Sequence, residues 1–150
     1  MAIVLDLSDI IYDVIIDTVN TEETFEAGRD IGRSLVGGDI VELVGDVGAG
    51  KTTLTKGIAV GLGVDEPVQS PSFTISQNYQ ARDGLRLVHY DFYRLPDAGI
   101  MSEELKETIN DPRAVVVVEW ADTVADILPK ARKKVVISTT SEEGRRLEIL

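Results

Sequence analysis

Hydrophobic residues recur along the chain with two different spacings. Residues 25–35 and 54–62 carry apolar or glycine positions three or four apart, which predicts two helices, the first with Thr21 as its N-cap. Residues 40–44, Ile-Val-Glu-Leu-Val, are bounded by turn signals and are predicted as a strand. Residues 114–118 are apolar throughout, as expected of a strand covered on both faces in a parallel sheet. Strands and helices therefore alternate along the chain.

Two hairpins are also predicted. The first joins residues 74–80 to 85–93 through an Asp-Gly turn, and the second joins 133–140 to 145–150 through a turn that contains Gly144. The other predicted elements are a weakly alternating strand at 12–17, an irregular loop at 66–73 and a helix at 102–109 that ends before Asp111-Pro112.

The turn between the strand at 40–44 and the following helix carries a chemical motif. Residues 45–52, Gly-Asp-Val-Gly-Ala-Gly-Lys-Thr, match the phosphate-loop pattern G-x-x-x-x-G-K-[ST] in its required strand-to-helix context. Glycines let successive N–H groups cup a phosphate, and the helix N-terminus adds partial positive charge. We expect Lys51 to reach the β- and γ-phosphates and Thr52 to bind Mg²⁺. The alternative is an ordinary glycine-rich turn.

These elements together predict the fold class. It is an α/β fold of the P-loop NTPase type: a three-layer sandwich with a central, mainly parallel sheet and antiparallel hairpin additions.

Two acids stand where strands are predicted to end. Glu119 follows the apolar run at 114–118, and Asp91 follows the strand that begins at Leu85. The carboxyl ends of strands in such a sheet lie on the side of the phosphate loop, so both side chains are candidates to hold the metal or position water. The alternative is that either acid caps a strand end or pairs with Arg94 on the surface.

Length and composition narrow the class of protein. A chain of 150 residues is expected to form a single domain over residues 1–150, with 1–13 as an N-terminal extension of unassigned role. It has no cysteine and one histidine, which excludes disulfides and makes a zinc cluster unfavourable. No apolar run has the length of a membrane span, and no secretory signal is recognisable, so a cytoplasmic location is expected.

The net charge of the chain indicates which kind of partner is disfavoured. The formal net charge is −11, which disfavours direct contact with a polyanion. Basic residues gather near the end of the chain, where a solvated strand edge is the favoured explanation: Lys130, Arg132, Lys133, Lys134, Arg145 and Arg146.

Several separated motifs, taken in order, resemble one family. The phosphate loop is followed at fitting distances by "QSPSFTISQNY" at 69–79, "HYDFYRL" at 89–95, "VVVVEWAD" at 115–122 and "ILP" at 127–129. From about Thr21 to Leu150, this combination is similar to the bacterial TsaE family of small ATPases.

The resemblance implies a function in RNA modification. It implies Mg²⁺-dependent ATP hydrolysis, slow in the isolated protein, during formation of N6-threonylcarbamoyladenosine at position 37 of tRNAs. In that family TsaD, paired with TsaB, transfers the group, and TsaE binds the pair and supports repeated turnover. The implied partners are therefore TsaD, TsaB and ATP or ADP, without direct binding of tRNA or of a membrane.

The resemblance also implies roles for individual residues. Lys51 and Asp91 are the catalytic candidates, with Asp91 orienting water, and Thr52 and Glu119 are the candidate Mg²⁺ ligands. The phosphate-binding stretch comprises Gly45, Asp46, Val47, Gly48, Ala49, Gly50, Lys51, Thr52 and Thr53.

Further nucleotide contacts follow from the same resemblance. Trp120 is expected close to the nucleotide, although a core position explains its spacing equally well. Thr21 and Arg145 are expected near the base and ribose. Residues 70–73 resemble a nucleotide-sensitive switch loop, in which Ser72 replaces the threonine of the family and lacks its β-branch.

The sequence leaves three points open. His89 suits either proton transfer or a buried structural role, the latter being favoured. Arg94 suits an arginine finger acting in cis, a partner contact or a surface salt bridge. The terminal "RRLEIL" ends in mid-pattern, so further residues after Leu150 are conceivable.

Two other functions use the same phosphate loop. A small kinase would phosphorylate an acceptor molecule, but no arginine-rich lid is recognisable between Pro67 and Arg113. A nucleotide-gated binding module would bind partners without meaningful turnover, and its phosphate release would not respond to Asp91→Asn.

Overall fold

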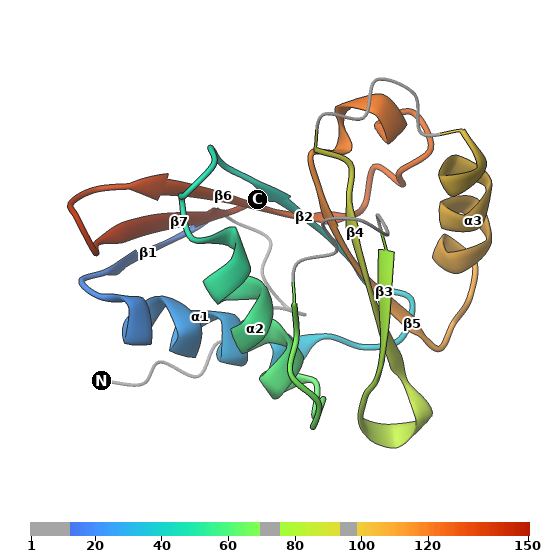
Figure 1. Ribbon diagram of the computed structural model, residues 1–150, viewed down its shortest axis with the longest axis horizontal. Helices are drawn as coiled ribbons and strands as arrows, with labels where there is room; N and C mark the ends of the chain where they lie inside the picture. The colour runs from blue at the N-terminus through green and yellow to red at the C-terminus, as the bar shows by residue number, and fades with distance from the viewer. Residues whose placement is uncertain (1–12, 70–75, 94–98) are drawn as a thin grey trace.

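The computed structural model describes residues 13–69, 76–93 and 99–150 (Figure 1). Within these residues, seven strands form one sheet in the order β1-β7-β6-β2-β5-β4-β3. The strands are β1 (Val14–Thr18), β2 (Ile40–Val44), β3 (Ser76–Gln80), β4 (Arg86–Asp91), β5 (Ala114–Glu119), β6 (Lys133–Thr139) and β7 (Arg145–Ile149). The helices are α1 (Thr21–Ser34), α2 (Lys51–Gly61) and α3 (Ile100–Ile109), with short 3-10 turns η2 (Arg82–Gly84) and η3 (Ala121–Val124).

The centre of the sheet is parallel and its margins are antiparallel. Strands β6, β2, β5 and β4 run parallel to one another, whereas β7 and β1 extend one side and β3 the other in antiparallel pairing. Both predicted hairpins, β3–β4 and β6–β7, are confirmed. Asp83 and Gly84 in the first hairpin both have positive φ, as a tight hairpin turn requires.

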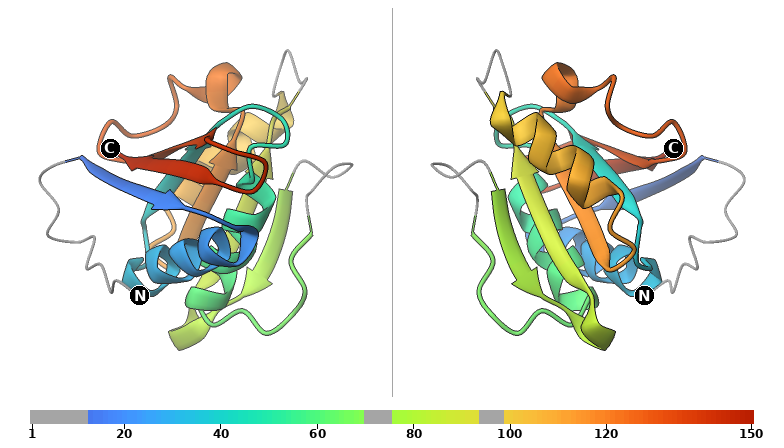
Figure 2. Two further views of the ribbon diagram at one scale, coloured as in Figure 1. Left: turned by 90° about the vertical axis from the view of Figure 1, so that its left-hand side faces the viewer. Right: turned by 90° about the vertical axis from the view of Figure 1, so that its right-hand side faces the viewer.

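Helices cover both faces of the sheet and complete the three layers (Figure 1). Helices α1 and α2 pack on one face, in a core that includes Ile58, Val115 and Val117. Helix α3 and η3 lie on the other face, where the core includes Leu105 and Val116. The right-hand view of Figure 2 shows α3 in front of β4 and β5. Successive β5 residues enter opposite cores, which explains the absence of alternation at 114–118, and the predicted fold class is confirmed.

The start of α1 differs from the prediction. Thr21 is not the N-cap but the first helical residue, and Asn20 is the cap. The side-chain oxygen of Asn20 accepts a hydrogen bond from Glu23 N at 2.8 Å, which satisfies one N–H group of the first turn. The first strand also begins and ends later than predicted, at Val14 and Thr18, and α3 begins earlier, at Ile100.

Helices α1 and α2 approach so closely that their backbones touch. A Cβ atom at Gly57 would lie 2.1 Å from Phe25 O, and one at Gly28 would lie 2.4 Å from Leu54 O. This contact fixes α2, and therefore the loop before it, against α1 and the sheet.

Gly57→Ala is expected to destabilise the protein by about 1–3 kcal/mol, because the added methyl group forces the two helices apart. Urea unfolding measures the change. Lys56→Ala, at an exposed position of the same helix, is the matched control and is expected to stay within about 0.5 kcal/mol of the wild type. Equal unfolding midpoints for Gly57→Ala and the control would show that the helices have room to separate.

In the described ranges, no helix combines the length and the apolar character needed to cross a membrane.

Candidate functional site

The phosphate-loop motif connects β2 to α2 as predicted. Gly48 and Gly50 have φ values of 81° and 104°, in the region that favours glycine. Ala49 N donates to Asp46 O at 3.0 Å and closes a turn within the loop. Leu54 N donates to Gly50 O, so the amides of the first three helical residues, 51–53, precede the first hydrogen bond of α2. Such amides suit an anion.

Lys51 is buried at the centre of the loop, with 7% of its surface exposed. Its ammonium group donates hydrogen bonds to Gly45 O and, at 3.3 Å, to Asp46 O. The same nitrogen lies 4.2 Å from the centroid of the Trp120 ring, a cation–π contact. The positive charge of Lys51 is therefore fixed inside the loop by two carbonyl oxygens and an aromatic ring.

Asp91 and Glu119 are neighbours, as their positions at strand ends predict. They are paired residues at the ends of the parallel strands β4 and β5. Burial raises the pKa of Asp91 above the ordinary value for a carboxyl, and the Glu119 charge adds to this. A hydrogen bond from Tyr93 N, at 3.0 Å, and the charges of His89 and Lys51 oppose the rise in this pKa. Two carboxylates thus share an edge of the sheet with the lysine charge close by.

Glu119 is buried and paired with His89. The distance between Glu119 Oε2 and His89 Nε2 is 2.6 Å, and the histidine side chain is 2% exposed. His89 Nδ1 is buried and makes no hydrogen bond within the described part of the chain. This contact fits the structural role for His89, because its ring holds the carboxylate. It does not fit a surface cap or salt bridge at Glu119.

Trp120 adopts an unusual backbone conformation directly after Glu119. Its φ and ψ are 54° and 51°, a left-handed conformation that a bulky residue rarely adopts and that costs of the order of 1–3 kcal/mol. The ring lies over Lys51 and also packs against Tyr93, with centroids 4.7 Å apart. Trp120 is half-buried and packs against the core on the α3 face of the sheet, so it contacts both this core and Lys51.

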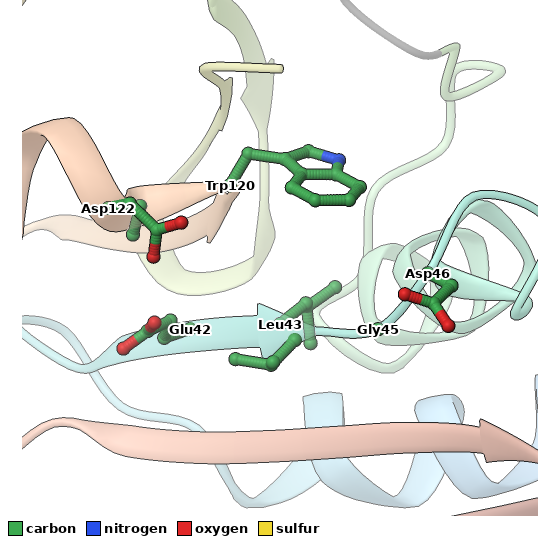
Figure 3. A pocket seen from close by; sticks show the side chains of 8 residues that line it. Glu42, Leu43, Gly45, Asp46, Trp120 and Asp122 are labelled. Carbon is green, nitrogen blue, oxygen red and sulfur yellow. The ribbon is translucent and has the colours of Figure 1, made fainter. Parts of the chain in front are cut away.

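A hollow of about 160 Å³ lies beside the start of the phosphate loop. Figure 3 shows the indole of Trp120 across the hollow from Leu43, with Asp46 and Asp122 towards its two ends. Glu42 also lines it and is ion-paired with Arg132 at 2.7 Å. Glu42 and Asp122 were not predicted as lining residues, although an acid inside the apolar run at 40–44 is a signal that marks Glu42.

Arg145 contacts the loop, and the strand that pairs with it leads into α1. The Arg145 guanidinium donates to Ala49 O at 2.8 Å, and Thr18 is its partner in the β1–β7 register. Thr21, three residues after Thr18, is exposed at the first position of α1. The expected roles of both residues at the base and ribose stay predictions.

Oxygen donors suited to Mg²⁺ are present at the predicted positions. The metal prefers hydroxyl, carboxylate and phosphate oxygens and is usually held by few protein ligands together with substrate phosphates. Thr52 is exposed at the second position of α2, and Glu119 and Asp91 provide carboxylates. Among the described residues no group of three acids or histidines could hold a metal alone. The hydroxyl of Thr52 and the two carboxylates fit a metal that is held partly by the phosphates of a nucleotide.

The predicted switch loop at 70–73 and Arg94 lie outside the described residues, so their roles stay predictions. Within 66–69, the part of the predicted irregular loop that is described, no helix or strand forms.

The sheet order and the glycine loop between β2 and α2 define a P-loop NTPase-type α/β protein. The family model described as "Threonylcarbamoyl adenosine biosynthesis protein TsaE" matches residues 18–147, and the chain belongs to this family. The resemblance found in the sequence is thereby confirmed.

Individual relatives agree with this assignment. The chain is 41% identical over 132 residues to the tRNA threonylcarbamoyladenosine biosynthesis protein TsaE of Bacillus subtilis, covering 87% of this chain and 80% of that one. It is 37% identical over 129 residues to the TsaE protein of Streptomyces coelicolor, covering 83% and 87%. A crystal structure of Bacillus subtilis YdiB superposes with a TM-score of 0.74 at 34% identity, covering 93% of this chain and 86% of the other.

Proposed function

We propose that this protein binds and slowly hydrolyses ATP with Mg²⁺ as an accessory factor in the formation of N6-threonylcarbamoyladenosine at position 37 of tRNAs. The observation that carries the proposal is the position of Lys51, inside a glycine loop and close to the paired carboxylates Asp91 and Glu119. Family membership supplies the pathway, because the relatives are named for tRNA threonylcarbamoyladenosine biosynthesis.

The roles of the site residues follow from their chemistry. The amides of the loop and of the first turn of α2 would bind phosphate oxygens, and Lys51 would exchange its carbonyl partners for the β- and γ-phosphates. Thr52 and Glu119 would hold Mg²⁺, which when bound neutralises charge that develops on the phosphates. Asp91 would accept a hydrogen bond from the attacking water and orient it.

The contact between His89 and Glu119 supports this division of labour. His89 fixes one oxygen of the Glu119 carboxylate, which leaves the other for a ligand. The Trp120 ring lies over Lys51, so a phosphate chain bound to Lys51 would pack against this ring or displace it.

The proposed partners are proteins of the TsaD and TsaB type in the cytoplasm, and the hydrolysis supports their repeated turnover. A net charge of −11 does not favour direct contact with tRNA, so we propose that the RNA is held by the partners.

A pull-down with a TsaD and TsaB pair, with and without ATP, followed by phosphate release, tests partner and activity together. ATP-dependent retention with phosphate release that the pair accelerates is expected. Retention without phosphate release would favour a nucleotide-gated binding module, and phosphorylation of a metabolite would favour a kinase.

Thr52→Val is expected to raise the Mg²⁺ concentration needed for half-maximal nucleotide binding and turnover by about tenfold to a hundredfold. The valine keeps the shape of the side chain, but the oxygen ligand is lost. Titration of Mg²⁺ at fixed ADP measures the effect. Lys56→Ala, at an exposed position of the same helix, is the control and is expected to keep the metal dependence of the wild type. A shift in thermal unfolding with unchanged metal dependence would remove Thr52 from the metal site.

A further inference from the structure

Arg145, the first residue of β7, makes an unusual set of contacts. Its side chain donates five hydrogen bonds, and all of them go to backbone carbonyl oxygens. Nε donates to Ala49 O at 2.8 Å, and one terminal nitrogen donates to Gly48 O at 3.4 Å. The other terminal nitrogen donates into the β6–β7 turn, to Ser141 O, Glu142 O and Gly144 O at 3.2, 3.3 and 2.7 Å. One side chain thus joins this turn to the phosphate loop.

The charge of Arg145 has no carboxylate partner among the ion pairs of the described residues. Its neighbour Arg146 differs, because it is exposed and forms a two-pronged ion pair with Asp17 at 2.8 and 3.0 Å. Arg145 is half-buried, so its guanidinium is a cation stabilised by carbonyl dipoles beside a loop suited to an anion.

The contact with Ala49 O determines the direction of an amide. In a trans peptide the carbonyl oxygen and the N–H of the next residue point in opposite directions. The Ala49 carbonyl points at Arg145, so the N–H of Gly50 points away from it. The Gly48 carbonyl also points at Arg145, and the N–H on the other side of that peptide, from Ala49, donates to Asp46 O at 3.0 Å and closes the turn of the loop. Gly50 is in a left-handed conformation, and a Cβ atom there would lie 3.5 Å from Arg145 Nε, so the side chain packs directly on this peptide.

We propose that Arg145 is a positioning residue that holds the peptide planes of Gly48–Gly50, so that the Asp46–Ala49 turn stays closed and the Gly50 N–H faces the phosphates of the nucleotide. This inference rests on the proposed function, in which the loop binds ATP. It differs from a contact with the base and ribose, because Arg145 acts through the loop backbone and therefore on phosphate recognition alone. The guanidinium geometry matters, since a single ammonium group cannot span the loop and the turn as a planar fork does.

Calorimetric titration with two probes, ADP and inorganic pyrophosphate, tests the inference in the full chain. Arg145→Gln and Arg145→Lys are each expected to weaken binding of both probes by a similar factor, about tenfold to a hundredfold, from the loss of charge-assisted hydrogen bonds. Arg146→Gln, which removes the neighbouring charge, is the matched control and is expected to bind both probes as the wild type does.

The two probes distinguish an Arg145 that orients the loop from an Arg145 that contacts the base and ribose. Weaker binding of ADP with unchanged pyrophosphate binding would overturn the inference and place Arg145 at the base and ribose. Full binding by Arg145→Lys would also overturn it, because charge without the fork would then suffice. A wild type that binds neither probe would overturn the proposed function itself, and the inference with it. Hydrogen exchange at Gly48–Gly50, faster in Arg145→Lys than in Arg146→Gln, is the expected second readout.

Discussion

Lys51→Ala is expected to lower kcat/KM for ATP hydrolysis by about 10²–10³-fold, because the site loses the fixed cation nearest to the phosphates. Lys51 is buried at the loop centre and is held by Gly45 O, Asp46 O and the Trp120 ring. These contacts keep its charge in place before a nucleotide arrives. The ammonium group is expected to exchange these carbonyl partners for phosphate oxygens when the nucleotide binds, so that little further reorganisation is needed when charge develops in the transition state.

Phosphate release and calorimetric binding of ADP measure this effect together. Lys56→Ala removes an exposed lysine from the same helix and is the matched control, with turnover expected to equal that of the wild type. If Lys51→Ala and Lys56→Ala hydrolysed ATP equally well, Lys51 would have no role in phosphate binding, and its contacts would serve the loop conformation alone.

Asp91→Asn is expected to reduce kcat by about 10²–10⁴-fold while nucleotide affinity changes little, because the amide keeps the shape but loses the negative charge that orients the attacking water. Asp91 is half-buried beside Glu119, and burial raises its pKa. A raised pKa in the folded state means that ionised Asp91 disfavours folding at neutral pH. The substitution is therefore expected to leave thermal stability unchanged or to increase it while turnover falls, a trade-off found at functional sites.

Single-turnover hydrolysis and thermal unfolding separate these two effects. Asp122→Asn, at an exposed acid near Trp120, is the control and is expected to retain turnover. Phosphate release that is the same in Asp91→Asn and wild type would contradict the assigned role and would favour a nucleotide-gated binding module.

The central elements of the fold could be predicted because their signals are local. The unbroken apolar run at 114–118 indicated a strand buried on both faces, and β5 contributes alternate residues to the two cores. The glycine loop could be recognised because a predicted strand precedes it and a predicted helix follows it. The proximity of Asp91 and Glu119 followed from a general property of parallel strands, whose carboxyl ends meet at one edge.

Features that depend on tertiary structure could not be predicted. Thr21 and Asn20 are both good N-caps by residue type, and the structure selects Asn20, whose backbone is extended where the chain leaves β1. His89 and Glu119 meet because His89 pairs with Val117 in the β4–β5 register, which places Glu119 two residues further along the same face. The fork of Arg145 reaches carbonyl groups nearly a hundred residues earlier in the chain, and no sequence pattern announces this.

A crystal structure with Mg²⁺ and a non-hydrolysable ATP analogue shows whether the glycine loop binds the triphosphate. We predict that the β- and γ-phosphates lie on the amides of the loop and of the first turn of α2. Lys51 Nζ is expected to have moved from Gly45 O to a phosphate oxygen, with Glu119 on the side of the metal. A nucleotide bound elsewhere, or a Lys51 still hydrogen-bonded to Gly45 O with the analogue in place, would show that this loop is not the phosphate site.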